Sequence, residues 1–246
     1  MTKGQSWRDP RRARRVMNSY AAQLSKIARQ VGVIMRPFDP HDTGSMSSAV
    51  QLLYGYGEIL RPWAEVTAKA MLDKVNQHDE SIWQAHAREI SRGLRLQVQS
   101  TPIGVRMREL LAEQVDLIQS IPRDAAERVH RLSQEALING ARASTVVDEI
   151  LRSEEVSLNR AKLIAHTEVS RASENLTQAR AESIGSPGYF WRTAEDGDVR
   201  KSHQKMAGKF VLWGSPPIFT EGKRTYSYHA GCFPNCRCYA DPVIPD

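Results

Sequence analysis

Apolar residues recur every three or four positions through most of the chain, and this spacing predicts successive amphipathic helices. A first break is expected near residues 36–46, where Pro37, Pro40 and Gly44 follow one another, because proline removes a backbone donor and fixes φ. Beyond this break the periodic segments that predict helices are residues 50–70 with a kink at Pro62, 82–94, about 102–118, 122–139 with Pro122 opening the helix, and 144–151.

The pattern changes from about Val156 onward. One long helical stripe ends at Gly185, a strand follows at residues 189–193, and a turn leads into one or two helical turns near 199–206. A second strand is expected at 210–213, and the last residues predict a loop that feeds a short strand. The fold class is therefore mainly α with a C-terminal α+β unit, in which a helical N-terminal and middle region precedes a small, few-stranded sheet.

Three segments follow from these patterns: an arm at 1–36, a helical region at 37–154 and an α+β domain at 155–246. In the last segment we expect Trp191 and Phe190 to pack on an apolar stripe formed by Ile164, Val169 and Leu176.

Composition indicates a globular protein, with 41% hydrophobic and 25% charged residues. The sequence has no apolar run near the roughly 18–20 residues that span a bilayer, and its first residues lack the apolar stretch of a signal peptide. We therefore expect the chain to remain in the cytoplasm where it is made.

Positive charge is concentrated in the arm. Residues 1–36 hold nine Lys or Arg against one acid, a net +8, so the rest of the chain carries −2 of the total +6. Arg8, Arg11, Arg12 and Arg15 are spaced for one helix face, with Arg14 beside them, while Val16, Tyr20, Leu24 and Ile27 form a neighbouring apolar stripe. Such an arm contacts either a nucleic acid, through its phosphates, or an acidic protein surface.

Three cysteines lie close together near the C-terminus, at positions 232, 236 and 238. Cys232, Cys236 and Cys238 with either His203 or His229 supply the ligand types of a structural zinc site. The alternative is that Cys236 and Cys238 are plain thiols on a strand, one buried as a small hydrophobic residue and the other exposed.

An enzymatic interpretation has to use Glu168, Asp196, Asp198, Arg200 and His203 as acid, base and anion-binding groups. The alternative is structural, with the two aspartates in a turn and Arg200 paired to one of them. The sequence contains no nucleophile elbow, phosphate-binding loop or zinc-protease helix, so we expect no enzymatic activity.

Three fragments of the C-terminal part, in this order, resemble the phage Mu F-like family, also called head morphogenesis or minor capsid proteins. They are the helix segment from Ile164 to Asn175, the segment from Trp191 to Gly208, and Asn-Cys-Arg-Cys at 235–238. The motif residues that carry the resemblance are Glu168, Arg171, Trp191, Asp198, Arg200 and Asn235. His166 stands where the family usually has Arg, and Phe233-Pro234 where it commonly has His; the resemblance covers roughly residues 140–246.

The resemblance implies a minor head protein that acts in head morphogenesis and DNA packaging. Its implied partners are the portal protein and the major capsid or scaffolding protein. The charge of the arm adds a separate expectation, which is contact with the portal or with genomic double-stranded DNA through Arg8, Arg11, Arg12, Arg14 and Arg15. Its implied location is the portal vertex inside the virion, after assembly in the host cytoplasm, with no membrane contact in the head. The alternatives are a DNA-binding module that uses the arm, or a nuclease- or transferase-like enzyme that uses Glu168, Arg200 and His203.

Overall fold

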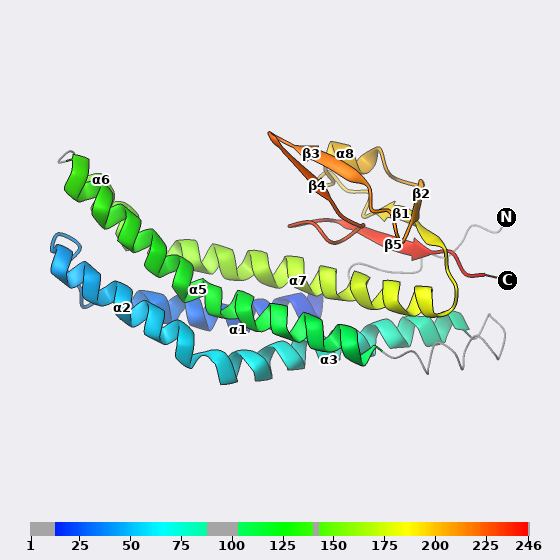
Figure 1. Ribbon diagram of the computed structural model, residues 1–246, viewed down its shortest axis with the longest axis horizontal. Coiled ribbons are helices and arrows are strands. Elements are labelled where there is room, and N and C mark those ends of the chain that lie inside the picture. Colours follow the sequence, from blue (N-terminus) through cyan, green and yellow to red (C-terminus); the bar gives the residue numbers. More distant parts are fainter. Residues whose placement is uncertain (1–12, 88–102, 140–142, 246) are drawn as a thin grey trace. The chain divides into compact units, whose positions relative to one another are not determined.

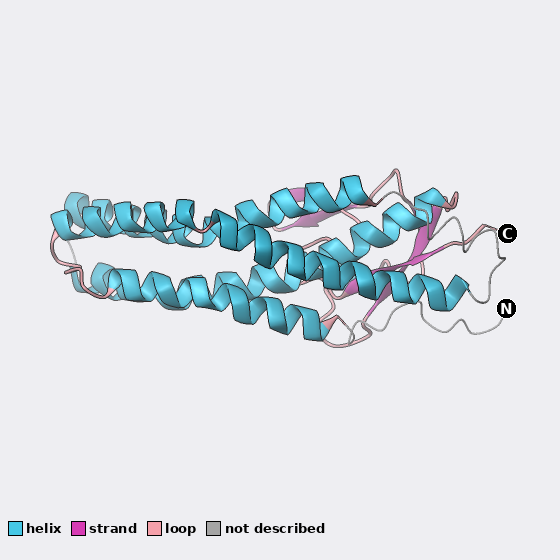
Figure 2. Cartoon of the chain, turned by 90° about the horizontal axis from the view of Figure 1, so that it is seen from below, coloured by secondary structure: helices cyan, strands magenta, loops and turns pink. Residues whose placement is uncertain are grey.

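The computed structural model describes residues 13–87, 103–139 and 143–245. Most of these residues are helical, and the strands belong to the C-terminal part of the sequence (Figures 1 and 2). The helices are α1 Arg14–Met35, α2 Thr43–Ile59, α3 Arg61–Ala87, α5 Gly104–Asn139, α6 Ala143–Leu151, α7 Ser153–Ser183 and α8 Lys201–Gln204. The strands are β1 Gly188–Thr193, β2 Phe210–Leu212, β3 Ile218–Glu221, β4 Arg224–Ser227 and β5 Cys238–Pro242. The predicted fold class, mainly α with a small C-terminal sheet, is confirmed.

The chain divides into two compact units, each assembled from separate stretches of sequence. Of the described residues, those within Met1–Met17, Ala70–Leu110 and His166–Asp246 form the sheet unit, and those within Asn18–Lys69 and Leu111–Ala165 form the helical unit. These two units are defined by packing contacts. The predicted arm, helical region and C-terminal domain were defined by sequence pattern, so the packing units do not test that division, and it stays a prediction. None of the described helices is long and apolar enough to cross a membrane.

In the helical unit three of the four residues of the predicted apolar stripe of α1 are buried, and the fourth, Val16, is partly exposed. Tyr20, Leu24 and Ile27 are all inside, and the Tyr20 hydroxyl donates to Gln114 Oε1 at 3.1 Å. The expected break after α1 is present: α1 ends at Met35, and α2 begins after Asp42, whose carboxylate accepts from two backbone N–H groups at its start. The core cluster here draws on α1, α2, α5 and Ile150 of α6: Val31, Met46, Ala49, Val50, Leu53, Ala125, Ala126, Val129, Leu132 and Ile150.

Two prolines interrupt the helical pattern with different results. A break occurs at Leu60, between α2 and α3, beside Pro62 as expected. The prediction that Pro122 opens a new helix is wrong, because α5 continues through it. An interior proline costs a helix about 3 kcal/mol. The residues on both sides of Pro122, Ile118 and Ala125 among them, are buried on one stripe, and their packing offsets that cost.

The sheet unit has β1 at the centre of an antiparallel sheet with strand order β2-β1-β5. Strands β3 and β4 form a separate antiparallel hairpin, which the sequence reasoning missed. The buried cluster contains Tyr189, Trp191, Val211, Trp213 and Phe219, together with Ala181 of α7 and Ile184 just after its end.

Neighbouring aromatics of β1 point to opposite faces of the sheet, as alternate strand residues must. Trp191 is fully buried, whereas Phe190 is 39% exposed and makes an edge-to-face contact with Phe210 at 5.8 Å between ring centroids. The expectation that both would pack on the α7 stripe is therefore wrong for Phe190. Trp191 packs in the cluster that includes Ala181, near the end of α7, and Ile184, just after it, and this cluster does not include Val169 or Leu176.

Candidate functional site

Three side chains with soft ligand atoms converge in the sheet unit. His203 lies on α8, Cys236 lies in the turn before β5, and Cys238 is the first residue of β5. The Nδ1 atom of His203 lies 3.5 Å from Cys236 Sγ and 3.4 Å from Cys238 Sγ. All three ligand atoms lie within 4.8 Å of one another. Segments separated by more than 30 residues therefore meet at one point.

The imidazole of His203 is held in place from several sides. Only 1% of the residue is exposed, and its Nε2 atom lies 3.0 Å from the Tyr228 hydroxyl. Its ring centroid lies 5.5 Å from that of Trp191 and 5.1 Å from that of Phe219. Because the Tyr228 contact occupies Nε2, the Nδ1 atom faces the two cysteines.

Strand register and turn geometry position the two cysteines. In the β1–β5 pair Trp191 is opposite Ala240 and Thr193 is opposite Cys238, so Trp191 and Cys238 are diagonal neighbours on one face. Asn235 has a φ of 53°, the left-handed conformation that asparagine tolerates, and it turns the chain so that Cys236 returns to His203. The indole N–H of Trp191 is buried and interacts with the Cys238 sulfur on this face.

The two thiols of the cluster are electrostatically unequal. A hydrogen bond from the Cys238 thiol, together with one from His203, lowers the pKa of Cys236, and the same hydrogen bond with Cys236 and burial raise the pKa of Cys238. The pKa values of the two neighbouring thiols are therefore shifted in opposite directions, with that of Cys236 below and that of Cys238 above the ordinary thiol value.

The other two predicted ligands lie outside this convergence. Burial, and then the nearby Glu174 carboxylate, raise the pKa of Cys232 to about 12, so its thiol stays protonated. His229 has its Nδ1 atom 3.1 Å from the Tyr189 hydroxyl, and burial lowers its pKa. Among the described residues, the group that could share one ion is His203, Cys236 and Cys238.

Residues of the family motif surround the turn that carries the cysteines, which we call the C-terminal turn (residues 232–238). Arg200 donates from Nη2 to the Pro234 carbonyl at 2.9 Å, and its guanidinium lies 5.0 Å from the centroid of the Phe233 ring. From α7, the Thr167 hydroxyl accepts a hydrogen bond from the Asn235 backbone N–H at 3.3 Å. These contacts fix the turn from two directions.

Arg237 adds a third contact, and it corrects a predicted ion pair. Its Nε atom donates to Asp196 Oδ2 at 2.9 Å, and its Nη1 atom lies 3.7 Å from Asp198. The structural alternative had paired Arg200 with these aspartates; the structure pairs them with Arg237 instead. The sequence spacing could not predict the pairing of Arg237 with Asp196, because the two residues are 41 positions apart.

Glu168 makes a structural contact of its own. It is buried on α7, and its Oε2 atom lies 2.8 Å from Nη2 of Arg171, three residues along the same helix. Two residues offered for an enzymatic role, Glu168 and Arg200, are thus engaged by neighbours that organise the fold. The sequence reasoning missed Thr167, Tyr228 and Arg237 as partners of the site, although Thr167 and Arg237 lie inside the quoted fragments.

The predicted polyanion-binding residues are only partly described. Arg14 and Arg15 are exposed at the start of α1, while Arg8, Arg11 and Arg12 lie outside the described residues.

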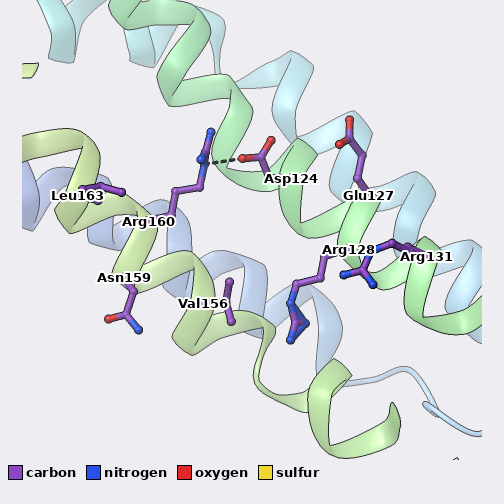
Figure 3. A pocket seen from close by; sticks show the side chains of 8 residues that line it. All are labelled: Asp124, Glu127, Arg128, Arg131, Val156, Asn159, Arg160 and Leu163. Atoms are coloured by element: carbon purple, nitrogen blue, oxygen red, sulfur yellow. Dashed lines mark ion pairs between the residues drawn. The ribbon is translucent and has the colours of Figure 1, made fainter. Parts of the chain in front are cut away.

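In the helical unit, α5 and α7 border an open groove of about 620 Å³ (Figure 3). Two of the arginines that line it form ion pairs: Arg160 Nε lies 2.5 Å from Asp124, and Arg128 Nη2 lies 2.5 Å from Glu149.

Comparison with known proteins finds similarity in the part of the chain that contains the site. Residues 127–241 match the model of a family described as "Phage Mu protein F like protein". A protein of Haemophilus influenzae (strain Rd), itself of uncharacterised function, is 30% identical over 145 residues, or 59% of this chain. The match spans about a third of that relative's length, 31%. No solved structure matches the chain.

Proposed function

Since residues 127–241 match the phage Mu protein F like family, we propose that the chain acts in phage head morphogenesis as a minor head protein. The observation that carries the proposal is that motif residues from separate parts of the matched region contact one another in the folded chain. Its motif residues Arg200 and Asn235, far apart in sequence, meet at the C-terminal turn.

A non-enzymatic role is consistent with this family, which is of the phage structural type. The contacts of the motif residues support the same view. Glu168 pairs with Arg171, and Arg200 binds a backbone carbonyl. Both interactions hold the fold in place, so a binding role accounts for these residues without a reaction.

The test is whether the protein is retained in heads. Purified heads from the phage that carries the gene are digested, and the copies of this chain are counted by mass spectrometry against the major capsid protein. We expect few copies per head, in complexes that copurify with the portal protein, and defective heads when the gene is deleted. Normal, infectious heads that lack the protein would refute the proposal.

The finer part of the proposal is that the arm contacts packaged DNA at the portal vertex. It is supported by the +8 charge of residues 1–36 and by the exposed Arg14 and Arg15, next to the buried stripe that begins at Tyr20. Because that stripe holds α1 in the helical unit, the exposed Arg14 and Arg15 ahead of it remain available for phosphates.

DNA binding by the full chain should weaken with salt at a logarithmic slope of about −0.9 per phosphate contacted. Deleting residues 1–15 should remove most of this slope and leave the folded body intact, because the deletion ends before Tyr20. The control replaces Lys162 and Lys223, exposed residues outside the arm, with Gln and should change the slope little. An unchanged slope in the deletion variant would assign the arm to protein docking instead.

A further inference from the structure

The hydrogen-bonding capacity of His203 is too small for its neighbours. A neutral imidazole has one N–H donor and one acceptor nitrogen. The Nε2 atom faces the Tyr228 hydroxyl at 3.0 Å, and both Cys236 and Cys238 approach the single remaining nitrogen at 3.5 and 3.4 Å. The single Nδ1 atom can make a good hydrogen bond with only one sulfur at a time, so the second sulfur depends on its neighbour thiol or on another group.

The spacing of the three atoms fits a shared ion. Zinc binds sulfur at about 2.3 Å and histidine nitrogen at about 2.0–2.1 Å, so a tetrahedral arrangement places the nitrogen about 3.5 Å from each sulfur. The two measured distances from Nδ1, 3.5 Å to Cys236 and 3.4 Å to Cys238, equal that edge within about 0.1 Å. Two edges of the tetrahedron are thus matched, and the third, between the two sulfur atoms, is no longer than 4.8 Å.

We propose that His203 Nδ1 and the thiolates of Cys236 and Cys238 bind one zinc ion, with a solvent molecule as the fourth ligand. Thiolate and imidazole ligands in a tetrahedral arrangement select zinc over hard cations, which prefer oxygen. The solvent ligand lies on the side of Cys236, which is partly exposed, whereas His203 and Cys238 are buried.

The surroundings of the ligands match those of metal sites. Metal-bound histidines usually direct the other ring nitrogen to a hydrogen-bond partner that fixes the ring, and Tyr228 fills that position here. Trp191 packs in the same cluster as Cys238, and its buried indole N–H interacts with the Cys238 sulfur. A metal-bound thiolate would be a stronger acceptor for this donor than a neutral thiol.

The ion would join two segments that otherwise meet only through side-chain packing and a few hydrogen bonds. His203 belongs to α8, and the cysteines belong to the C-terminal turn and β5, 33 and 35 residues later. Binding exchanges the remaining thiol protons for the ion and adds its binding free energy to folding. The site would therefore stabilise the turn on which the family-motif contacts converge, independently of whether the protein acts in heads.

The test uses the full chain, expressed and purified under reducing conditions with added zinc. Elemental analysis should find about one zinc per chain. Cobalt(II) in place of zinc should give the visible bands of tetrahedral cobalt and a thiolate charge-transfer band. Cys236→Ser and His203→Asn should each abolish stoichiometric binding and the cobalt spectrum. Cys236→Ser is the more informative variant because Cys236 is partly exposed, so its replacement leaves the core filled.

Cys232→Ser is the matched control, since Cys232 is in the same turn but not in the cluster. It should keep the zinc and the cobalt spectrum. A chelator should lower the melting temperature of the unaltered chain and leave that of Cys236→Ser unchanged.

Three results would overturn the proposal. The first is less than about 0.1 equivalent of zinc in the reduced protein. The second is that Cys232→Ser loses the metal as completely as Cys236→Ser does. The third is a Cys236–Cys238 disulfide that persists when zinc is present. The last of these would make the pair a redox site.

Discussion

Asp79 and Arg180 form a buried ion pair that joins α3 to α7 within the sheet unit. The side chain of Asp79 is 0% exposed and that of Arg180 is 4% exposed. Asp79 also accepts from the Thr177 hydroxyl at 2.6 Å, and Arg180 donates to Asn76 Oδ1 at 2.7 Å. Replacing Asp79 with Asn keeps the shape of the side chain but leaves the guanidinium buried without its counter-charge.

We expect Asp79→Asn to lower the free energy of unfolding by about 3–5 kcal/mol, the usual cost of removing one partner from a buried pair. For a chain of this size each kcal/mol lowers the melting temperature by about 2–4 °C, so the expected shift is roughly 10 °C. The double variant Asp79→Asn/Arg180→Met removes both charges and should recover much of the loss, because no unpaired charge remains. Urea and thermal unfolding of the single and double variants measure the coupling.

The control is the exposed ion pair of Arg131 and Glu135, whose side chains are 61% and 47% exposed. Glu135→Gln should cost less than about 0.5 kcal/mol, because water and salt screen such a pair. The reasoning is refuted if Asp79→Asn is no more destabilising than Glu135→Gln. It is equally refuted if the double variant is as unstable as the sum of the two single variants, since that means the charges do not act as a pair.

Two further predictions concern the sheet unit. Trp191→Ala should cost about 3–5 kcal/mol, because it empties a fully buried aromatic site, and normal unfolding stability of this variant would contradict the placement of the core. His229 has a lowered pKa because burial disfavours its charged form, so the unfolded chain binds its proton more tightly and stability should fall as pH drops below about 6.5. His229→Gln should flatten that dependence in unfolding curves measured between about pH 5.5 and 7.5, and an unchanged slope would remove His229 as its source.

Local patterns were sufficient for many elements of this fold. The α1 stripe of Tyr20, Leu24 and Ile27 is buried as its spacing predicts, because helical periodicity specifies which residues share a face. The strands at 188–193 and 210–212 were also expected from short apolar runs bounded by glycine. The β3–β4 hairpin was missed, although Gly222 in its two-residue turn, with a φ of 64°, is a recognisable signal.

Other features depended on tertiary packing, which overrides local preference. Pro122 should have started a helix, but a buried stripe continues on both sides of it, and α5 does not stop there. Likewise, the burial of Trp191 and the exposure of Phe190 depend on which face of β1 meets the core, and alternation along a strand leaves that choice open.

In the candidate site, too, some features followed from the sequence and others depended on tertiary packing. The sequence by itself determined that three cysteines and two histidines were available near the C-terminus, and that a family motif surrounds them. Only the tertiary structure decided that His203 meets Cys236 and Cys238 while His229 turns to Tyr189. The physical reason is distance along the chain: periodicity relates residues a few positions apart, whereas this convergence depends on where β5 pairs with β1 and on how α8 packs beside them.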